Sequence, residues 1–223
     1  MKERIIKYKG RDIDVYFTVD RCTHVAECIR GSPDVFNAGR RPWIMADAAE
    51  SDKVAEVIQR CPTGALHFKR KNGGSEEAVP AENAVRICRH GPLYLKGDLK
   101  LKNFDGSSIL TDTRIALCRC GESRIMPICD KSHAFTGFRD KGTFARGKIQ
   151  QNSDQGSLTV TLTKNGPLLL QGPVEILDPE GELCFKGKTV TLCRCGQSQN
   201  MPFCDGTHVK AGFKTKKDVV LHH

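Results

Sequence analysis

The 223-residue chain has few aromatic side chains, which make up 6% of it, and one tryptophan. It contains no apolar run that approaches the roughly 20 residues of a membrane-spanning helix. Its charged first twelve residues are not followed by an apolar stretch, so they do not resemble a secretion signal. It also lacks a nucleophile–base set, a phosphate loop and a nucleotide fingerprint, which favours a non-enzymatic protein. We therefore expect small domains and no membrane partner.

Cysteine, by contrast, is abundant. The chain has eleven cysteines, and this odd number without a secretion signal argues against a framework of disulfides. Thiols at this density are typical of metal binding, where the metal contributes part of the folding energy of small, loop-rich units. We therefore predict a cytoplasmic protein, because that compartment keeps thiols reduced.

The formal net charge of the chain is +9. Its basic residues are scattered, with the densest groups at 69–71 and 214–217, and they form no single basic stripe. A nucleic-acid site usually needs such a stripe, so we interpret the charge as a solvated surface and predict no nucleic-acid partner.

One cysteine–histidine string occurs twice in the second half of the chain. Each copy reads C-x-C-x8-C-x3-H, and the copies are 75 residues apart. Segments 91–138 and 166–213 align without a gap, with 19 identities in 48 positions, which indicates a duplicated unit. Three thiolates and an imidazole in so short a span form a metal-ligand set. The candidate ligands are Cys118, Cys120, Cys129 and His133 in the first copy, and Cys193, Cys195, Cys204 and His208 in the second.

These strings resemble the motif of the CDGSH iron–sulfur proteins, the mitoNEET-like family. The second copy fits the family motif throughout, whereas the first has Lys131 where the family has glycine. The resemblance implies one [2Fe–2S] cluster in each copy. It also implies that the two β-rich modules pair as an intramolecular pseudo-dimer, in a monomeric chain with an internal pseudo-twofold. Structural zinc is the alternative use of a Cys3His set.

The histidine ligand suggests a redox mechanism. A neutral imidazole leaves each site one negative charge short of an all-cysteine site, which favours reduction. A second ring nitrogen that faces solvent can take up a proton together with the electron. The C-x3-H spacing places both side chains on one helical turn, for which Asp130 and Asp205 are candidate N-caps.

Several other residues of the repeats accompany the ligands in sequence. We expect four of them to lie around the clusters: Arg119, Arg194, Ser123 and Ser198. For the two arginines, exposure to solvent is the alternative. Cys88 and Cys184 have no cysteine counterpart in the other copy, so we expect them to be ordinary buried thiols.

The N-terminal part has a different pattern. Residues 4–8, 13–17 and 65–68 have the composition of strands, and 47–60 has that of an amphipathic helix with Asp47 and Glu50 as a capping box. This part carries three candidate ligands, Cys22, Cys28 and Cys61. Together with His24, 33–36, 40–43 and 61–66, they resemble a small divergent mono-cluster ferredoxin domain.

The cluster type of this domain is open. Val25 stands where the four-iron loop C-x2-C-x2-C has its middle cysteine, so three thiolates favour a [3Fe–4S] cluster. A [4Fe–4S] cluster would need a fourth ligand, for which His24 is the candidate. Three buried cysteines without metal are the remaining interpretation.

These observations predict an α+β chain: a ferredoxin-like domain at 1–70, a polar linker at 71–84, and CDGSH domains at 85–145 and 146–223. Because a third cluster suits a redox chain, we expect one-electron transfer with a redox partner protein. The alternatives are a carrier or sensor that donates labile clusters to an apo iron–sulfur acceptor, and an adaptor with structural metals.

Overall fold

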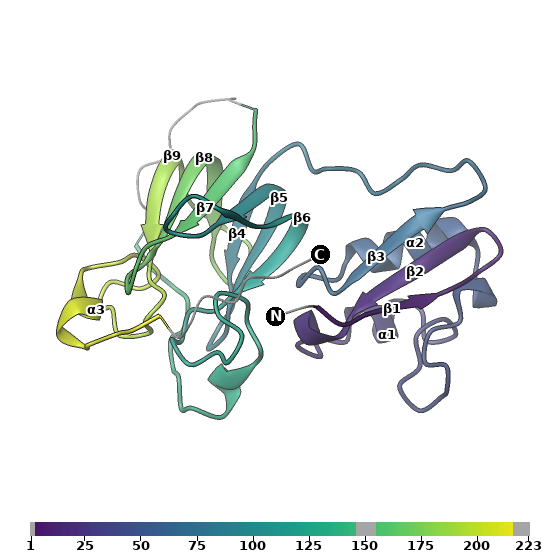
Figure 1. Cartoon of the computed structure of the whole chain (residues 1–223), viewed down its shortest axis with the longest axis horizontal. Helices are drawn as coiled ribbons and strands as arrows, with labels where there is room; N and C mark the ends of the chain where they lie inside the picture. The colour runs from purple at the N-terminus through teal and green to yellow at the C-terminus, as the bar shows by residue number, and fades with distance from the viewer. Residues whose placement is uncertain (1–2, 146–154, 216–223) are drawn as a thin grey trace. The chain divides into compact units, whose positions relative to one another are not determined.

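The computed structural model describes residues 3–145 and 155–215. These divide into two compact units, Glu3–Val79 and the part from Pro80 onward (Figure 1). Among the described helices, none combines the length and the apolar character needed to cross a bilayer. The boundary predicted between 145 and 146 borders residues 146–154, which lie outside the described residues.

The first unit is a three-stranded antiparallel sheet with a helix against it. The strands β1 (Ile5–Tyr8), β2 (Ile13–Thr18) and β3 (Leu66–Arg70) pair in that order, close to the predicted ranges. Ile13 and Val15 of β2 are buried against α2 (Ser51–Gln59) in one hydrophobic core. Three short segments lie between β2 and α2 in sequence: η1 (Val19–Arg21), α1 (Glu27–Gly31) and η2 (Ala46–Ala48).

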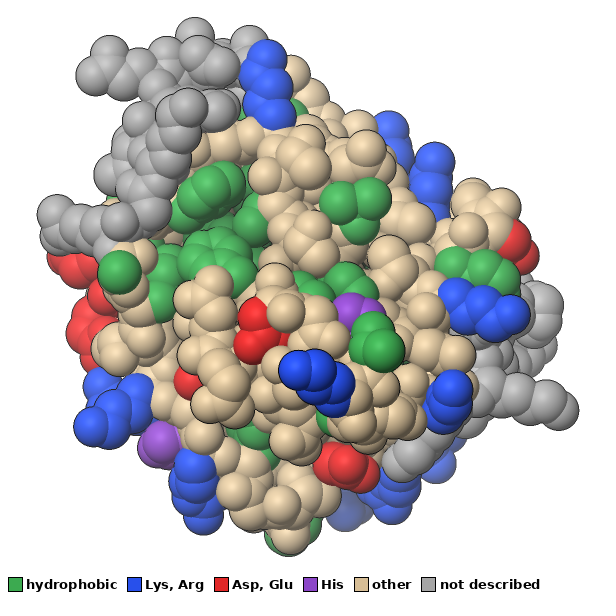
Figure 2. Space-filling view, turned by 90° about the vertical axis from the view of Figure 1, so that its left-hand side faces the viewer, with side chains coloured by type: hydrophobic (Ala, Val, Ile, Leu, Met, Phe, Trp, Pro, Cys, Tyr) green, Lys and Arg blue, Asp and Glu red, His purple; other side chains and the backbone are tan. Residues whose placement is uncertain are grey.

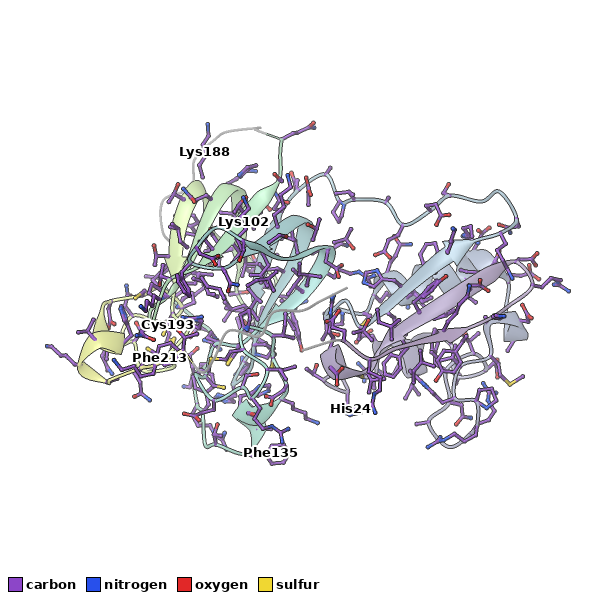
Figure 3. The ribbon with its side chains drawn as sticks, viewed as in Figure 1. His24, Lys102, Phe135, Lys188, Cys193 and Phe213 are labelled. Atoms are coloured by element: carbon purple, nitrogen blue, oxygen red, sulfur yellow. The ribbon has the colours of Figure 1, made fainter. Side chains whose placement is uncertain are left out.

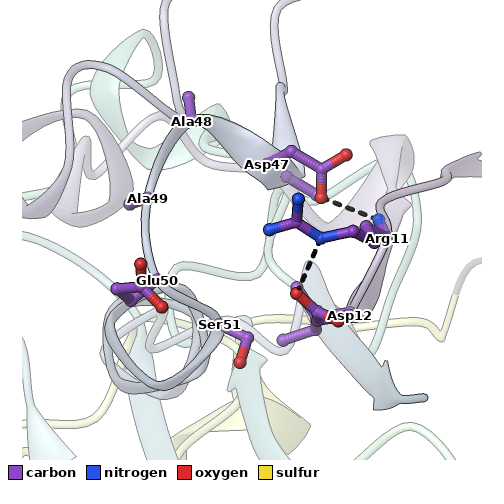
Figure 4. A pocket seen from close by; sticks show the side chains of 9 residues that line it. Arg11, Asp12, Asp47, Ala48, Ala49, Glu50 and Ser51 are labelled. Atoms are coloured by element: carbon purple, nitrogen blue, oxygen red, sulfur yellow. Dashed lines mark hydrogen bonds and ion pairs between the residues drawn. The ribbon is translucent and has the colours of Figure 1, made fainter. Parts of the chain in front are cut away.

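The predicted start of the long helix was wrong. Residues 46–48 form a separate 3-10 turn, and Ala49 is extended before α2 begins at Ser51. The Asp47 carboxylate does not cap the helix; it accepts a hydrogen bond of 2.7 Å from the backbone N–H of Arg11 (Figure 4). This bond fastens the turn to the β1–β2 hairpin. Arg11, Asp12 and Asp47 line a polar hollow. In it, Nε of Arg11 is also paired with Oδ2 of Asp12, at 3.1 Å.

The second unit contains both repeats, each with three strands. The first repeat supplies β4 (Ala84–Ile87), β5 (Leu93–Lys102) and β6 (Ser108–Leu117). The second supplies β7 (Leu158–Leu162), β8 (Leu168–Leu177) and β9 (Leu183–Leu192). Side chains of all six strands form one hydrophobic core. A short helical turn follows the strands of each repeat, η3 (Ser132–Ala134) in the first and α3 (Thr207–Lys210) in the second.

The repeats exchange strand pairings across the sheet (Figure 1). β4 pairs with β5 of its own repeat and runs parallel to β8 of the other, while β7 pairs with β8 and runs parallel to β5. The register is symmetric: Ala84 opposes Glu175, and Thr159 opposes Lys100, so each partner is displaced by the 75-residue period. This exchange is the arrangement expected of two modules paired within one chain, because the same surface of each contacts the other.

Two glycines allow the repeats to meet at the metal-ligand loops. Cys120 and Cys195 form an antiparallel backbone bridge. A Cβ atom on Gly121 would lie 2.5 Å from the carbonyl oxygen of Cys195, and one on Gly196 would lie 2.5 Å from that of Cys120. Both glycines also have positive φ, of 82° and 77°. The bridge therefore requires glycine at both positions.

We expect Gly121→Ala to destabilise the unit by about 3 kcal/mol or more, because it adds a steric clash to an unfavourable backbone conformation. Gly137→Ala is the matched control: Gly137 has φ 72° but no atom within 4 Å of its Cβ position, so only the backbone cost of about 1–2 kcal/mol applies. Urea unfolding of both variants measures the difference. Equal losses would show that the contact at the bridge is unimportant.

Candidate metal centres

The first ligand pair of each repeat lies where a core strand ends. β6 ends at Leu117 and β9 at Leu192, so the C-x-C sequence follows directly and its position is fixed by the sheet. The Sγ atoms are 3.6 Å apart both between Cys118 and Cys120 and between Cys193 and Cys195. All four of these thiols are buried.

The ligand loop then folds back on the same strand. The backbone N–H of Cys129 donates to Ala116 O at 2.9 Å, and that of Cys204 donates to Thr191 O at 3.0 Å. In the short helical turn that follows, His133 Nδ1 lies 3.5 Å from Cys129 Sγ. The second repeat has the same distance between His208 Nδ1 and Cys204 Sγ. The structure therefore brings together the four predicted ligands of each repeat as two pairs.

These pair distances fit tetrahedral metals. Two thiolates with bonds of about 2.3 Å lie about 3.8 Å apart at a tetrahedral angle, and a thiolate with a nitrogen at about 2.0 Å lies about 3.5 Å away. Among the described residues, no three His, Cys, Asp or Glu side chains converge as the ligands of a single ion do. Two ligand pairs per repeat match a two-iron cluster, whose irons each take two protein ligands.

Aspartates fix the loop that carries the second pair. Asp130 accepts from the N–H of Ser132 at 2.9 Å and from Arg124 at 3.0 Å, and Asp205 accepts from the N–H of Thr207 at 3.0 Å. Each aspartate accepts a hydrogen bond from the first residue of the helical turn, but it lies one position before the N-cap residue. The predicted N-cap positions were therefore wrong by one residue. Burial alone would raise the pKa of Asp130, but these hydrogen bonds bring it to about 2.

Lys131, which stands where the family motif has glycine, leaves the backbone conformation of the first motif unchanged. Lys131 has φ 72° and ψ 8°, close to φ 85° and ψ −3° at Gly206 in the second copy. Its N–H donates to Cys129 Sγ at 3.4 Å. Lysine in this left-handed conformation costs about 1 kcal/mol relative to glycine. The first motif therefore keeps its conformation, at a modest cost in stability.

The thiols must lose protons to bind metal. Burial raises the pKa of Cys129 to about 12 and that of Cys195 to about 11. The hydrogen bond between Cys118 and Cys120 lowers the pKa of Cys118 to about 7 and raises that of Cys120. Burial also lowers the pKa of His133, which keeps its ring neutral and able to bind metal. Metal binding therefore releases protons and weakens in acid.

The two arginines between the paired cysteines are buried, so the alternative of solvent exposure is wrong. Arg119 and Arg194 are each 1% exposed. The Nε atoms of both donate to the turn before β5 or β8, to Gly91 O at 3.1 Å and to Gly166 O at 2.8 Å. Each guanidinium also stacks on an aromatic ring, Phe138 or Phe213; the latter is labelled beside Cys193 in Figure 3.

The histidine ligands, unlike the cysteine pairs, lie at the surface. His133 and His208 are partly exposed, and a histidine side chain reaches the surface on the face shown in Figure 2. Their neighbours Phe135 and Val209 are 84% and 74% exposed. In the second repeat, Nε2 of His208 lies 3.4 Å from the Cβ position of Gly166, so the turn held by Arg194 borders this nitrogen.

In the first unit, the three predicted thiols line one cavity. Cys22, Cys28 and Cys61 meet there with the apolar side chains of Phe17, Trp43 and Leu66. Burial raises the pKa of Cys28 to about 11, and the nearby Cys61 and Cys22 add to this rise. His24 Nδ1 is 4.0 Å from Cys22 Sγ. All three candidate thiols and His24 therefore line one cavity.

The loop between Cys22 and Cys28 is strained in a way that sequence reasoning missed. His24 and Ala26 have positive φ, of 57° and 67°, although neither is glycine. Strain of this kind persists only where the surrounding structure demands it, and it is common at functional sites. Of the two remaining thiols, Cys184 is buried as expected, whereas Cys88 is only partly buried.

Comparison with known proteins finds family matches in three ranges of the chain. Residues 8–71 match the family described as "Divergent 4Fe-4S mono-cluster", and residues 90–134 and 165–209 match "Iron-binding zinc finger CDGSH type". The N-terminal part is 45% identical over 64 residues to an uncharacterized protein, YjdI, from Escherichia coli K12 and equally to YjdI from strain O157:H7. That alignment covers 29% of this chain and 84% of YjdI.

No solved structure matches the chain significantly. The candidate ligands of all three sites fall within the matched ranges. The chain is therefore an iron–sulfur protein that belongs to the CDGSH family and carries a divergent 4Fe-4S mono-cluster domain before its two CDGSH domains.

Proposed function

We propose that this protein carries single electrons on three clusters, of which the two Cys3His clusters are [2Fe–2S] and exchange a proton with the electron. The observation that carries the proposal is the placement of the histidines. His133 and His208 direct Nδ1 at a ligand thiol, 3.5 Å away, while their rings are partly exposed. Because Nδ1 faces the thiol, Nε2 is the ring nitrogen that remains for proton exchange, and in the second repeat it borders the turn at Gly166.

A bound [2Fe–2S] cluster supplies a one-electron centre. The protein would hold this cluster through two thiols that are buried from water at a strand end, and through a cysteine–histidine pair near the surface. The histidine ring would supply its Nδ1 lone pair as a ligand, and Nε2 would bind a proton in the reduced state and release it in the oxidised state. Because added negative charge favours proton uptake, Nε2 binds its proton more tightly when the site gains an electron.

The third cluster is proposed on Cys22, Cys28 and Cys61. Three thiols around one cavity support the [3Fe–4S] type that the missing cysteine at Val25 favours. The description of the matching family favours four irons, and then His24 supplies the fourth ligand, because its Nδ1 lies 4.0 Å from Cys22 Sγ. Counting iron distinguishes these two forms.

The partner of such a protein is a redox protein that meets the exposed histidine side of a CDGSH site, in the cytoplasm. The same exposure favours one second function, the donation of clusters to an apo iron–sulfur acceptor. A ligand that is protonated at the surface is lost more readily than a buried thiolate. Transfer of a cluster to an apo-ferredoxin faster than electron transfer would favour the donor function.

The proton coupling predicts a potential that depends on pH. Between about pH 5 and 8, we expect the CDGSH midpoint potentials to fall by up to ~59 mV per pH unit, since one proton accompanies one electron. His133→Cys and His208→Cys should remove the slope of the site that carries them and slow bleaching in acid. A redox titration followed by absorption at several pH values measures both; a flat wild-type profile would contradict the mechanism.

The aspartates do not explain acid loss in this range. The folded pKa of Asp130 and of Asp205 is lowered to about 2, from 3.8. Their contribution to stability is therefore complete above pH about 4 and is lost only as the pH falls through about 2. Bleaching between pH 5 and 7 is thus assigned to the histidines. If Asp205→Asn shifted it as much as His208→Cys, this assignment would be wrong.

The three-cluster proposal predicts the iron and sulfide content of anaerobically purified protein. We expect about seven irons and eight sulfides per chain for a [3Fe–4S] third cluster, or about eight of each for [4Fe–4S]. Cys28→Ser should remove only the third cluster, and Cys184→Ser, which changes a buried thiol outside the ligand sets, should remove none. Zinc without sulfide would overturn the redox function.

A further inference from the structure

The two CDGSH sites differ at one position close to their ligands. Residues 140 and 215 correspond at the 75-residue period, but one is aspartate and the other threonine. The Asp140 carboxylate is paired with Nη1 of the buried Arg119. At the second site, Oγ1 of Thr215 accepts a hydrogen bond of 2.9 Å from Nη2 of Arg194. The carboxylate and the hydroxyl therefore each lie against the guanidinium of a buried arginine, the first on Nη1 and the second on Nη2.

The surrounding hydrogen bonds are similar in both repeats, with one exchange. The N–H of His90 donates to the backbone oxygen of Asp140, whereas the N–H of Asn165 donates to Oγ1 of Thr215. The N–H of Asp140 donates to His90 Nδ1 at 3.0 Å, and the N–H of Thr215 donates to Asn165 Oδ1 at 2.9 Å. Each arginine holds the turn before β5 or β8 with two further hydrogen bonds to carbonyl oxygens. Because both arginines keep the same pair of carbonyl partners, the main difference between the sites at this position is the charge of the carboxylate.

This charge lies where solvent screens it weakly. The Arg119 side chain is fully buried, and the Asp140 side chain is 20% exposed. Arg119 is also the residue between the ligands Cys118 and Cys120. A negative charge in such a place opposes the arrival of an electron at the adjacent site, and the low local dielectric makes the effect larger than at the surface.

We infer that Asp140 and Thr215 give the two [2Fe–2S] sites different reduction potentials, with the first site lower and the second higher. This inference deepens the proposed electron transfer and rests on it. A single electron delivered by a reducing protein to either site then comes to rest on the second site. The pair thus has a direction, from the repeat with Asp140 to the repeat with Thr215.

Lys131, Arg124 and Cys88 also differ from their counterparts in the second repeat, and their effects are weaker or neutral. Lys131, which replaces glycine in the first motif, would favour reduction there, but it lies at the rim and is partly exposed to screening solvent. The Arg124 side chain beside it is paired with Asp130, at 3.0 Å. Cys88, at the position of Thr163, stays an uncharged thiol because burial raises its pKa. The Asp140 carboxylate, paired with a fully buried guanidinium, is therefore expected to dominate.

The test is a redox titration of the full holoprotein at fixed pH, followed by electron paramagnetic resonance. Wild type should show two midpoints, with an electron favouring the second site about tenfold, or about 59 mV. Asp140→Thr should raise the lower midpoint until the two merge, and Thr215→Asp should lower the upper one until they merge. The double exchange should separate them again.

Matched neutral variants isolate the charge from the shape. Asp140→Asn keeps the size and polarity of the side chain and should raise the lower midpoint as Asp140→Thr does. Thr215→Asn should leave the upper midpoint in place. A single midpoint in wild type, no shift with Asp140→Asn, or a larger shift with Lys131→Gly would each overturn the inference, as would fewer than two [2Fe–2S] clusters per chain.

The outcomes separate this inference from the proposed function. Two charge-dependent midpoints in a protein that passes no electrons to any tested flavin or iron–sulfur reductase would retain the inference and remove electron transfer as the function. Electron transfer with one shared midpoint would retain the function and remove the inference.

Discussion

The backbone bridge between Cys120 and Cys195 is the contact on which both CDGSH sites depend. It joins the two C-x-C sequences, so neither ligand pair can move without the other, and it requires glycine next in sequence on both sides. The parallel pairings of β4 with β8 and of β5 with β7 join the two repeats, and β6 and β9, whose ends lead to the ligands, pair with β5 and β8. Sheet, core and ligand positions are therefore one cooperative structure, in which a core strand from one repeat supports the site of the other.

Within this frame, each site divides into a buried half and an exposed half. The C-x-C thiols lie beneath the sheet end, where burial keeps them from solvent, whereas the histidine lies on a single helical turn tied down by an aspartate. A ligand on so short a turn cannot be stabilised by the turn itself, because one turn gains little helical free energy. The position of the histidine depends instead on the hydrogen bonds accepted by the aspartate carboxylate, and on the backbone hydrogen bonds that return the loop to the strand. This division suits a site that keeps its cluster and still exchanges protons with water.

Much of the local structure was predictable from sequence, because it follows from residue type and spacing. Residues 13–17 alternate apolar and polar side chains, residues 4–8 and 65–68 have the composition of strands, and the ligand pairs follow from C-x-C and C-x3-H. The start of α2 was not predictable, since the tertiary bond from Arg11 to Asp47 competes with capping. Nor was the burial of Arg119 and Arg194, because a charged residue is buried only where its partners, here carbonyls distant in sequence, are supplied by the fold. The positive φ of His24 and Ala26 likewise has no signal in their residue types.

Duplication within one chain also explains why the sites need not be equal. Two identical subunits around a true twofold axis have identical sites, so any residue that changes one changes both. In this chain the strand register and the ligand distances remain symmetric, while Lys131, Cys88 and Asp140 face Gly206, Thr163 and Thr215 at the corresponding positions. The shared core tolerates these replacements because none of the six side chains belongs to it. Covalent linkage of the repeats therefore preserves the frame that both clusters need, and it leaves the electrostatic surroundings of each site free to change separately.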